Sequence, residues 1–153
     1  MKAIEVFPYC NDLRDCFYDT YAALTEDQIN WKPDNHKNNI AFLLRHVAQA
    51  EDWFVRSIVL GQDMVPKRKA ELPTVVEILD YLKSSREQTL NVLTSMTVED
   101  LSQTRSLGEG FRGGAREGAT VHWIFNRMFQ HESYHYGQVN MLMRLQGLEP
   151  PKM

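Results

Sequence analysis

The apolar residues of this chain recur at helical spacing, and no stretch alternates apolar and polar residues as a half-buried strand would. The clearest case is a stripe between residues 119 and 146 whose members recur in alternating steps of four and three: Ile124, Met128, His131, His135, Gln138, Leu142 and Leu145. Such steps are typical of the buried seam of a helix bundle. They predict a long last helix that begins near Ala119 or Thr120 and ends near Gln146, just before Gly147.

Three further segments show the same helical spacing. We expect a first helix from about Asn11 to Leu24, a second from about Ile40 to Leu60 and a third from about Val75 to Met96. The stretches TEDQ from Thr25 and TVVE from Thr74 have the form of capping boxes, which mark helix starts. Four helices of this period predict an all-α four-helix bundle.

A glycine-rich segment separates the third helix from the last one. The stretch from Leu101 to Gly118 reads LSQTRSLGEGFRGGAREG and has no helical period, which predicts a long, hairpin-like loop. Loops of this length in small domains are often functional. The part from Gly108 to Gly118 is therefore a candidate cover for a binding site, although no residue in it demands that interpretation.

The size and charge of the chain restrict what it can bind. Its 153 residues suit a single domain that spans 1–153. The net charge is −3 and the pI is about 5.9, so the basic surface required for nucleic-acid binding is not expected. Apolar runs long enough for a signal peptide or a membrane span are absent from the sequence, which predicts a cytoplasmic protein without a membrane partner. Cys10 and Cys16 are too few for a disulfide framework and are expected as reduced thiols.

Two central positions of the last seam carry histidine where packing would favour Leu or Ile. A buried polar group without a partner costs about 1–3 kcal/mol, so these imidazoles need partners. His131 and His135 are one turn and about 40° apart on the helix, so both rings can reach one metal ion. His46 lies on a core-facing stripe of the second helix and is the candidate third ligand. Alternatively, all three are hydrogen-bonded core residues; His36 and His122 are expected to be surface or structural residues.

The segment from His131 to His135 reads HESYH and matches the HExxH motif of zinc proteases. In those enzymes the third metal ligand lies downstream of the motif, whereas here no histidine follows His135. Glu149, beyond the expected helix end, is a poor substitute. The chain also lacks the strands of a peptide-binding cleft. We therefore do not interpret the motif as that of a protease.

Three stretches of the chain resemble the DinB/YfiT-like superfamily of four-helix metalloproteins. They read LTEDQINWKPD after the first helix, NNIAFLLRHVAQAEDWF in the second, and HWIFNRMFQHESYHYGQVNMLMRLQGLEPP in the last. The resemblance covers nearly the whole chain and implies a bundle of up-down-down-up order, often as a homodimer. It also implies that His46, His131 and His135 bind a divalent metal ion, usually zinc or nickel, with water completing the shell.

The same resemblance implies an activity. Members of the family include thiol-dependent S-transferases and a mycothiol-dependent maleylpyruvate isomerase. A cation bound by three neutral imidazoles can lower the pKa of a bound thiol toward neutrality, so a low-molecular-weight thiol would attack a small electrophile as detoxification. The nucleophile would then come from this co-substrate rather than from Cys10 or Cys16. Two alternatives remain open: a metal-assisted hydrolase that uses bound water, and a non-catalytic, stress-linked metal-binding protein.

Four other polar or aromatic residues are candidates for the surroundings of the site. Asn39 and Trp53 share the stripe of His46, and Gln138 shares that of the other two histidines, so these three could line a pocket or serve in capping and packing. Glu132 could flank the site and orient a histidine, or it could be a solvated or inter-helix charge. The sequence assigns no catalytic residue.

Overall fold

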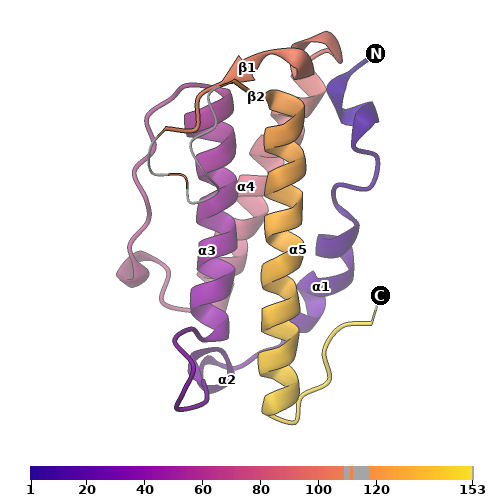
Figure 1. Ribbon diagram of the computed structural model, residues 1–153. Helices are drawn as coiled ribbons and strands as arrows, with labels where there is room; N and C mark the ends of the chain where they lie inside the picture. Colours follow the sequence, from indigo (N-terminus) through magenta and orange to yellow (C-terminus); the bar gives the residue numbers. More distant parts are fainter. Residues whose placement is uncertain (109–110, 112–117, 153) are drawn as a thin grey trace.

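The computed structural model describes residues 1–108, 111 and 118–152. Five α-helices account for most of this part of the chain: α1 (Asp12–Ala22), α2 (Glu26–Asn30), α3 (Ile40–Asp52), α4 (Val75–Ser95) and α5 (Val121–Leu145). The four longer helices form a bundle in which α3 and α4 run in one direction and α1 and α5 in the other (Figure 1). This confirms the all-α four-helix bundle and its up-down-down-up order.

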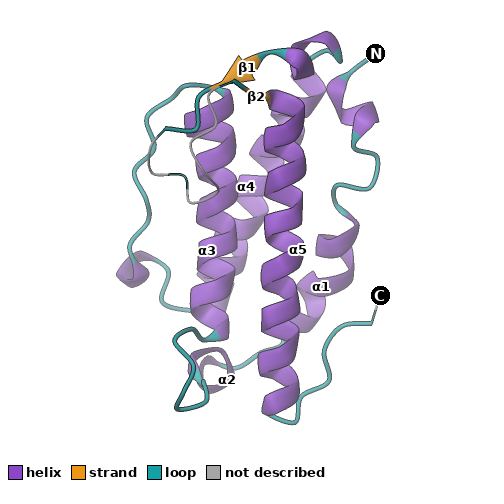
Figure 2. Ribbon diagram, viewed as in Figure 1, coloured by secondary structure: helices purple, strands orange, loops and turns teal. Residues whose placement is uncertain are grey.

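Several short elements connect the helices (Figure 2). Helix α3 continues without a break as a π-helix, η2 (Trp53–Val59), and three 3₁₀ turns cover Ala3–Val6, Lys69–Glu71 and Glu99–Ser102. Strands β1 (Thr104–Arg105) and β2 (Ala119–Thr120) pair antiparallel, with Thr104 opposite Thr120 and Arg105 opposite Ala119. The pair was not predicted, because two-residue strands are too short to show an alternating pattern.

The strand pair joins the two ends of the glycine-rich segment, as expected for a hairpin-like loop. The predicted cover from Gly108 to Gly118 lies largely outside the described residues, which include only its two ends and Phe111. The structure therefore leaves the role of this cover as a prediction.

The predicted helix starts and the last helix end have specific capping interactions. Thr25 and Thr74 each accept a hydrogen bond from the backbone N–H three residues later, and both capping boxes are complete. Asn39 Oδ1 accepts from the backbone N–H of Phe42 at 2.8 Å and begins α3. At the other end, α5 ends at Leu145 and is followed two residues later by Gly147, whose φ of 75° is the left-handed conformation that glycine adopts without strain.

A polar layer divides the core into two apolar clusters. One cluster, around Tyr21, Ile40 and Tyr136, lies toward α2, and the other, around Phe54 and Phe125, lies toward the strand pair. Between them, each of the four long helices contributes one buried charged side chain, from the set Arg14, Glu51, Arg86 and Glu132. We call these four residues the charge layer.

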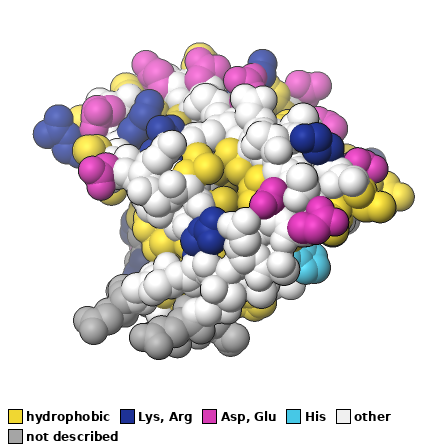
Figure 3. Space-filling view, turned by 90° about the horizontal axis from the view of Figure 1, so that it is seen from above, with side chains coloured by type: hydrophobic (Ala, Val, Ile, Leu, Met, Phe, Trp, Pro, Cys, Tyr) yellow, Lys and Arg dark blue, Asp and Glu magenta, His cyan; other side chains and the backbone are white. Residues whose placement is uncertain are grey.

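The buried face of α5 departs from the predicted seam near the end of the helix. Leu145 is 52% exposed although Met143 in the same turn is buried, because the buried face runs through Val139 and Met143. Seen from the end that carries the N-terminus, acidic side chains gather along one edge and basic side chains are scattered among them (Figure 3).

Within the described part of the chain, no helix combines the length and the apolar character needed to cross a bilayer.

Candidate metal centre

Three histidine side chains meet where α3 faces α5. His46 comes from α3, and His131 and His135 come from successive turns of α5. The Nε2 atom of His131 lies 3.0 Å from Nε2 of His46 and 3.1 Å from Nε2 of His135. Of the His, Cys, Asp and Glu side chains that the structure describes, only these form a group of three or more spaced for one metal ion.

The spacing suits a single tetrahedral cation. Zinc binds imidazole nitrogen at about 2.0–2.1 Å, so two ligand nitrogens of a tetrahedral site lie about 3.3 Å apart. Hydrogen bonds among the rings satisfy the cluster poorly, since a neutral imidazole has one proton and Nε2 of His131 has two close nitrogen neighbours. A metal ion would accept the lone pairs of all three nitrogens. The donor set therefore fits a divalent metal held by three protein ligands.

Gln138 lies against the outer nitrogen of one of these rings. Its Oε1 is 2.6 Å from Nδ1 of His135, and its Nε2 is 3.5 Å from the hydroxyl of Tyr134. With the proton on Nδ1 donated to this amide oxygen, Nε2 of His135 presents its lone pair to the other histidines. Metal-bound imidazoles commonly have such a partner on the second nitrogen.

The environment keeps the three imidazoles neutral. Burial is the largest cause that lowers the pKa of each below 6.5. For His131 the pKa falls to about 3, because burial is joined by the positive charges that His135 and His46 would carry. Arg127 lowers the pKa of His131 further, whereas the hydrogen bond that His135 donates to Gln138 opposes the shift at His135. Since neutral imidazole is the form that binds metal, the site is ready for a cation at neutral pH.

A cavity of about 490 Å³ opens beside the cluster. Its lining includes His46, His131, Trp53, Phe111 and Arg127. Trp53 is the first residue of the π-helix that continues α3, and such π-helical turns frequently occur at functional sites. The predicted pocket residue Trp53 thus lies beside the histidines.

The other predicted pocket residue of α3 lies elsewhere. Asn39 caps the helix, and its amide nitrogen donates to the backbone carbonyl of Asn30 at 3.2 Å. It does not line the cavity beside the histidines. Of the two uses expected for this residue, capping is the one that the structure displays.

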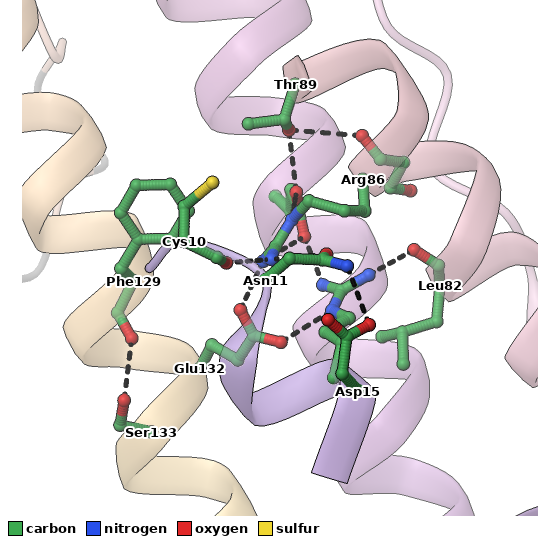
Figure 4. A network of polar contacts seen from close by, with 12 residues as sticks. Cys10, Asn11, Asp15, Leu82, Arg86, Thr89, Phe129, Glu132 and Ser133 are labelled. Carbon is green, nitrogen blue, oxygen red and sulfur yellow. Dashed lines mark hydrogen bonds and ion pairs between the residues drawn. The ribbon is translucent and has the colours of Figure 1, made fainter. Parts of the chain in front are cut away.

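Glu132 follows His131 in the sequence but points to a different part of the bundle. Its Oε1 accepts from Nε of Arg14 at 2.5 Å, and its Oε2 accepts from Arg86 (Figure 4). The side chain is buried, its ion pairs run to these arginines, and it also accepts a hydrogen bond from Tyr136; its described partners include no histidine. The structure thus places Glu132 as an inter-helix charge and not as a solvated one.

The rest of the charge layer completes a closed set of ion pairs. Glu51 pairs with Arg14 and with Arg86, whose Nε lies 2.7 Å from Glu51 Oε1. Thr89 donates to the same oxygen at 2.6 Å. Burial alone would raise the pKa of Glu51, but Arg14 and Arg86 together hold it below 4.5.

The sequence itself carries a signal for this layer. On α4 an apolar stripe with steps of three and four contains one arginine and one threonine: Leu79, Leu82, Arg86, Thr89 and Leu93. On α1, Arg14 precedes Phe17 and Tyr21 at the same spacing. Charged side chains at seam positions predict buried pairs, because an unpaired charge is too costly to bury.

Comparisons with known proteins agree with this architecture. The family profile of the DinB superfamily matches residues 12–139, which include all three histidines. Among solved structures, a conserved protein from Enterococcus faecalis is similar, with a TM-score of 0.72 and 18% identity over 95% of this chain and 97% of that chain. No curated protein matched the sequence. The match to the family profile, over most of the chain and on a four-helix bundle with this histidine cluster, shows that the chain belongs to the DinB superfamily.

Proposed function

We propose that His46, His131 and His135 bind one divalent metal ion, zinc or nickel, and that the site transfers a low-molecular-weight thiol to a small electrophile. The observation that carries the proposal is the convergence of three neutral imidazole nitrogens beside a cavity. Three protein ligands leave an open coordination position, which is typical of catalytic rather than structural sites. A cation bound in this way would lower the pKa of a coordinated thiol or water toward neutrality.

The side chains of the site would divide the remaining work. Gln138 fixes the tautomer and orientation of His135. The apolar walls of the cavity, such as Trp53 and Phe54, would exclude water from the electrophile. In the reaction the thiol loses its proton and the sulfur lone pair forms a bond to the electrophilic carbon. In a substitution the leaving group departs with its bonding electron pair; in an addition the π electrons move to the neighbouring atom, which takes up a proton.

The cysteines of the chain support an external thiol as the nucleophile. Cys10 is half-buried, and burial raises the pKa of its thiol, which reduces the reactive thiolate. Cys16 is exposed on α1. Neither thiol belongs to the group of side chains that could hold the metal.

The test combines metal analysis with a panel of thiols. Wild-type protein should bind about one zinc or nickel ion per chain and conjugate at least one thiol to an electrophile such as chlorodinitrobenzene. His135→Ala should lose most of both, whereas His36→Ala, an exposed histidine in a loop, should keep both. Unchanged conjugation by metal-free protein would exclude the proposal. Turnover of esters without added thiol would instead indicate the hydrolase.

A further inference from the structure

We propose that the cavity beside the histidines binds electrophiles with a flat, apolar body and an anionic group, and that Arg127 pairs with that group. The inference rests on the proposed function for the reaction, but the binding preference stands on the residues of the cavity. Neither the family match nor the similar solved structure assigns a ligand to this cavity.

The walls of the cavity are apolar and largely aromatic. The Trp53 ring lies 4.9 Å from the Phe54 ring and 6.4 Å from the Phe111 ring between centroids, and the planes of Trp53 and Phe111 differ by only 10°. Met64 and Pro66 complete the apolar lining. A volume of about 490 Å³ is in the range of small-molecule sites, and walls of this kind favour a planar ring.

These walls are tied to the metal-bearing helix. Gln49, one turn after His46 on α3, donates through Nε2 to the backbone carbonyl of Lys67, next to Pro66. The Lys67 ammonium in turn lies 4.6 Å from the centroid of the Tyr81 ring on α4. The loop that carries Met64 and Pro66 is therefore held against both α3 and α4, so the cavity is largely pre-formed.

Arg127 supplies a positive charge to this apolar cavity. It precedes His131 by four residues on α5, so the two side chains share one face of the helix, and both line the cavity. Among the described residues, the arginines that form ion pairs are Arg14, Arg56, Arg86 and, in an exposed turn, Arg68. Within that part of the chain, Arg127 has no carboxylate partner.

An anionic ligand would give this guanidinium its partner. Guanidinium binds carboxylate through two parallel N–H···O bonds, and such charge-assisted bonds are stronger than neutral ones. Arg127 lines the same cavity as His46 and His131, two of the three histidines. A ligand paired with Arg127 would therefore extend its body along the aromatic walls and present its reactive carbon toward the metal site.

Two ligands of equal shape and different charge test the preference. A chloronitrobenzoate and the matching chloronitrobenzamide share the ring and the leaving group and differ in the negative charge. Calorimetric titration of the metal-free protein should show the benzoate binding about 10- to 100-fold more tightly than the amide. Arg127→Gln should remove this difference and Arg127→Lys should keep part of it, while Arg144→Gln, an exposed arginine farther along α5, should preserve it.

Three outcomes would overturn the assignment. These are equal affinity of wild-type protein for both ligands, an unchanged preference in Arg127→Gln, and a preference that exists only in zinc-loaded protein, which would mean that the anion binds the metal. Turnover is measured separately, as chloride released when a thiolate displaces it from the ring of either compound. A binding preference without chloride release would support the subsite and contradict thiol transfer. Chloride release from both compounds, with equal efficiency and equal affinity, would support thiol transfer and contradict the subsite.

Discussion

His131 and Glu132 are neighbours in the sequence, yet they belong to two polar regions of opposite character. Glu132 lies in the charge layer, where both carboxylates are bonded to both guanidinium groups of opposite charge. His131 lies among side chains of its own kind, with Nε2 atoms of two other imidazoles at 3.0 and 3.1 Å. In the charge layer, each charged side chain has its partners within the protein. In the histidine cluster, nitrogen acceptors of the same kind meet beside a cavity.

The difference separates a structural role from a binding role. Charges in the core are tolerated when their partners are present, as in the charge layer. Nitrogen acceptors of the same kind converge favourably only around a proton or a metal ion. The lowered pKa values of the three histidines disfavour the proton. We infer that the completeness of its internal bonding, rather than its burial, distinguishes the charge layer from the candidate metal centre.

Removing a carboxylate from the charge layer should have the largest effect on stability. Glu132→Ala leaves Arg14 and Arg86 with one buried carboxylate between them, so the free energy of unfolding should fall by about 3–5 kcal/mol. Urea denaturation of the metal-free protein measures the change. Glu87→Ala, an exposed glutamate next to Arg86, is the control and should change the value by less than about 0.5 kcal/mol.

The same variant tests whether the two regions are independent. Because Glu132 is bonded to arginines rather than to histidines, folded Glu132→Ala protein should bind zinc with nearly wild-type affinity at low denaturant concentration. A variant that loses zinc while its stability hardly changes would show that Glu132 belongs to the metal centre, as the HExxH pattern suggests.

Gln138 should show the reverse behaviour, with a smaller effect. Gln138→Ala removes the partner of His135 Nδ1, which typically costs about 10- to 100-fold in metal affinity. The free energy of unfolding of the metal-free protein should change by less than about 1 kcal/mol, since the residue is only half-buried. Zinc titration against a competing chelator measures the affinity. Gln130→Ala, an exposed glutamine on the same helix, should leave it unchanged.

Helical spacing was sufficient to predict most of the fold. The predicted helices agree with the observed ones within two residues at each end, when the π-helix Trp53–Val59 is counted with α3. The π-helix itself was not predictable, because one extra residue per turn barely alters the apolar pattern. The exposure of Leu145 was missed because the buried face of α5 runs through Val139 and Met143, and spacing alone does not distinguish that face from the adjacent stripe that contains Leu145.

The proximity of the three histidines was also predictable, because His131 and His135 share a seam and His46 lies on a core-facing stripe. The partners of Glu132 were not predicted. Its position on α5 indicates a direction, but Arg14 and Arg86 come from helices whose rotation depends on the packing of the whole bundle. Arg127 was not singled out either, since a lone arginine on an exposed face is ordinary until a cavity appears beside it.

Acid should destabilise the two regions in different pH ranges, which gives the subtlest test. In metal-free protein the folded-state pKa values of His46, His131 and His135 lie below the unfolded value of 6.5, so only the unfolded chain gains these protons as the pH falls below 6.5. Their contribution to stability is therefore complete above pH 6.5 and declines toward the pKa of about 3 of His131. Glu51 has its pKa held below 4.5 by the two arginines, so the charge layer loses stability only in more acidic solution.

Urea midpoints measured between pH 7 and pH 3 should therefore decline in two stages. Replacing the three histidines by glutamine should remove the first stage, which begins near pH 6.5 and alone accounts for the decline down to about pH 4.5, because no imidazole of the cluster remains to be protonated in the unfolded chain. The second stage, below about pH 4.5, should persist in this variant because Arg14, Glu51 and Arg86 are unchanged. If the variant declined between pH 6.5 and 5 as steeply as the wild type, the lowered pKa values of the histidines would not be the cause. The contrast between a neutral metal centre and a charged core layer would then lose its electrostatic basis.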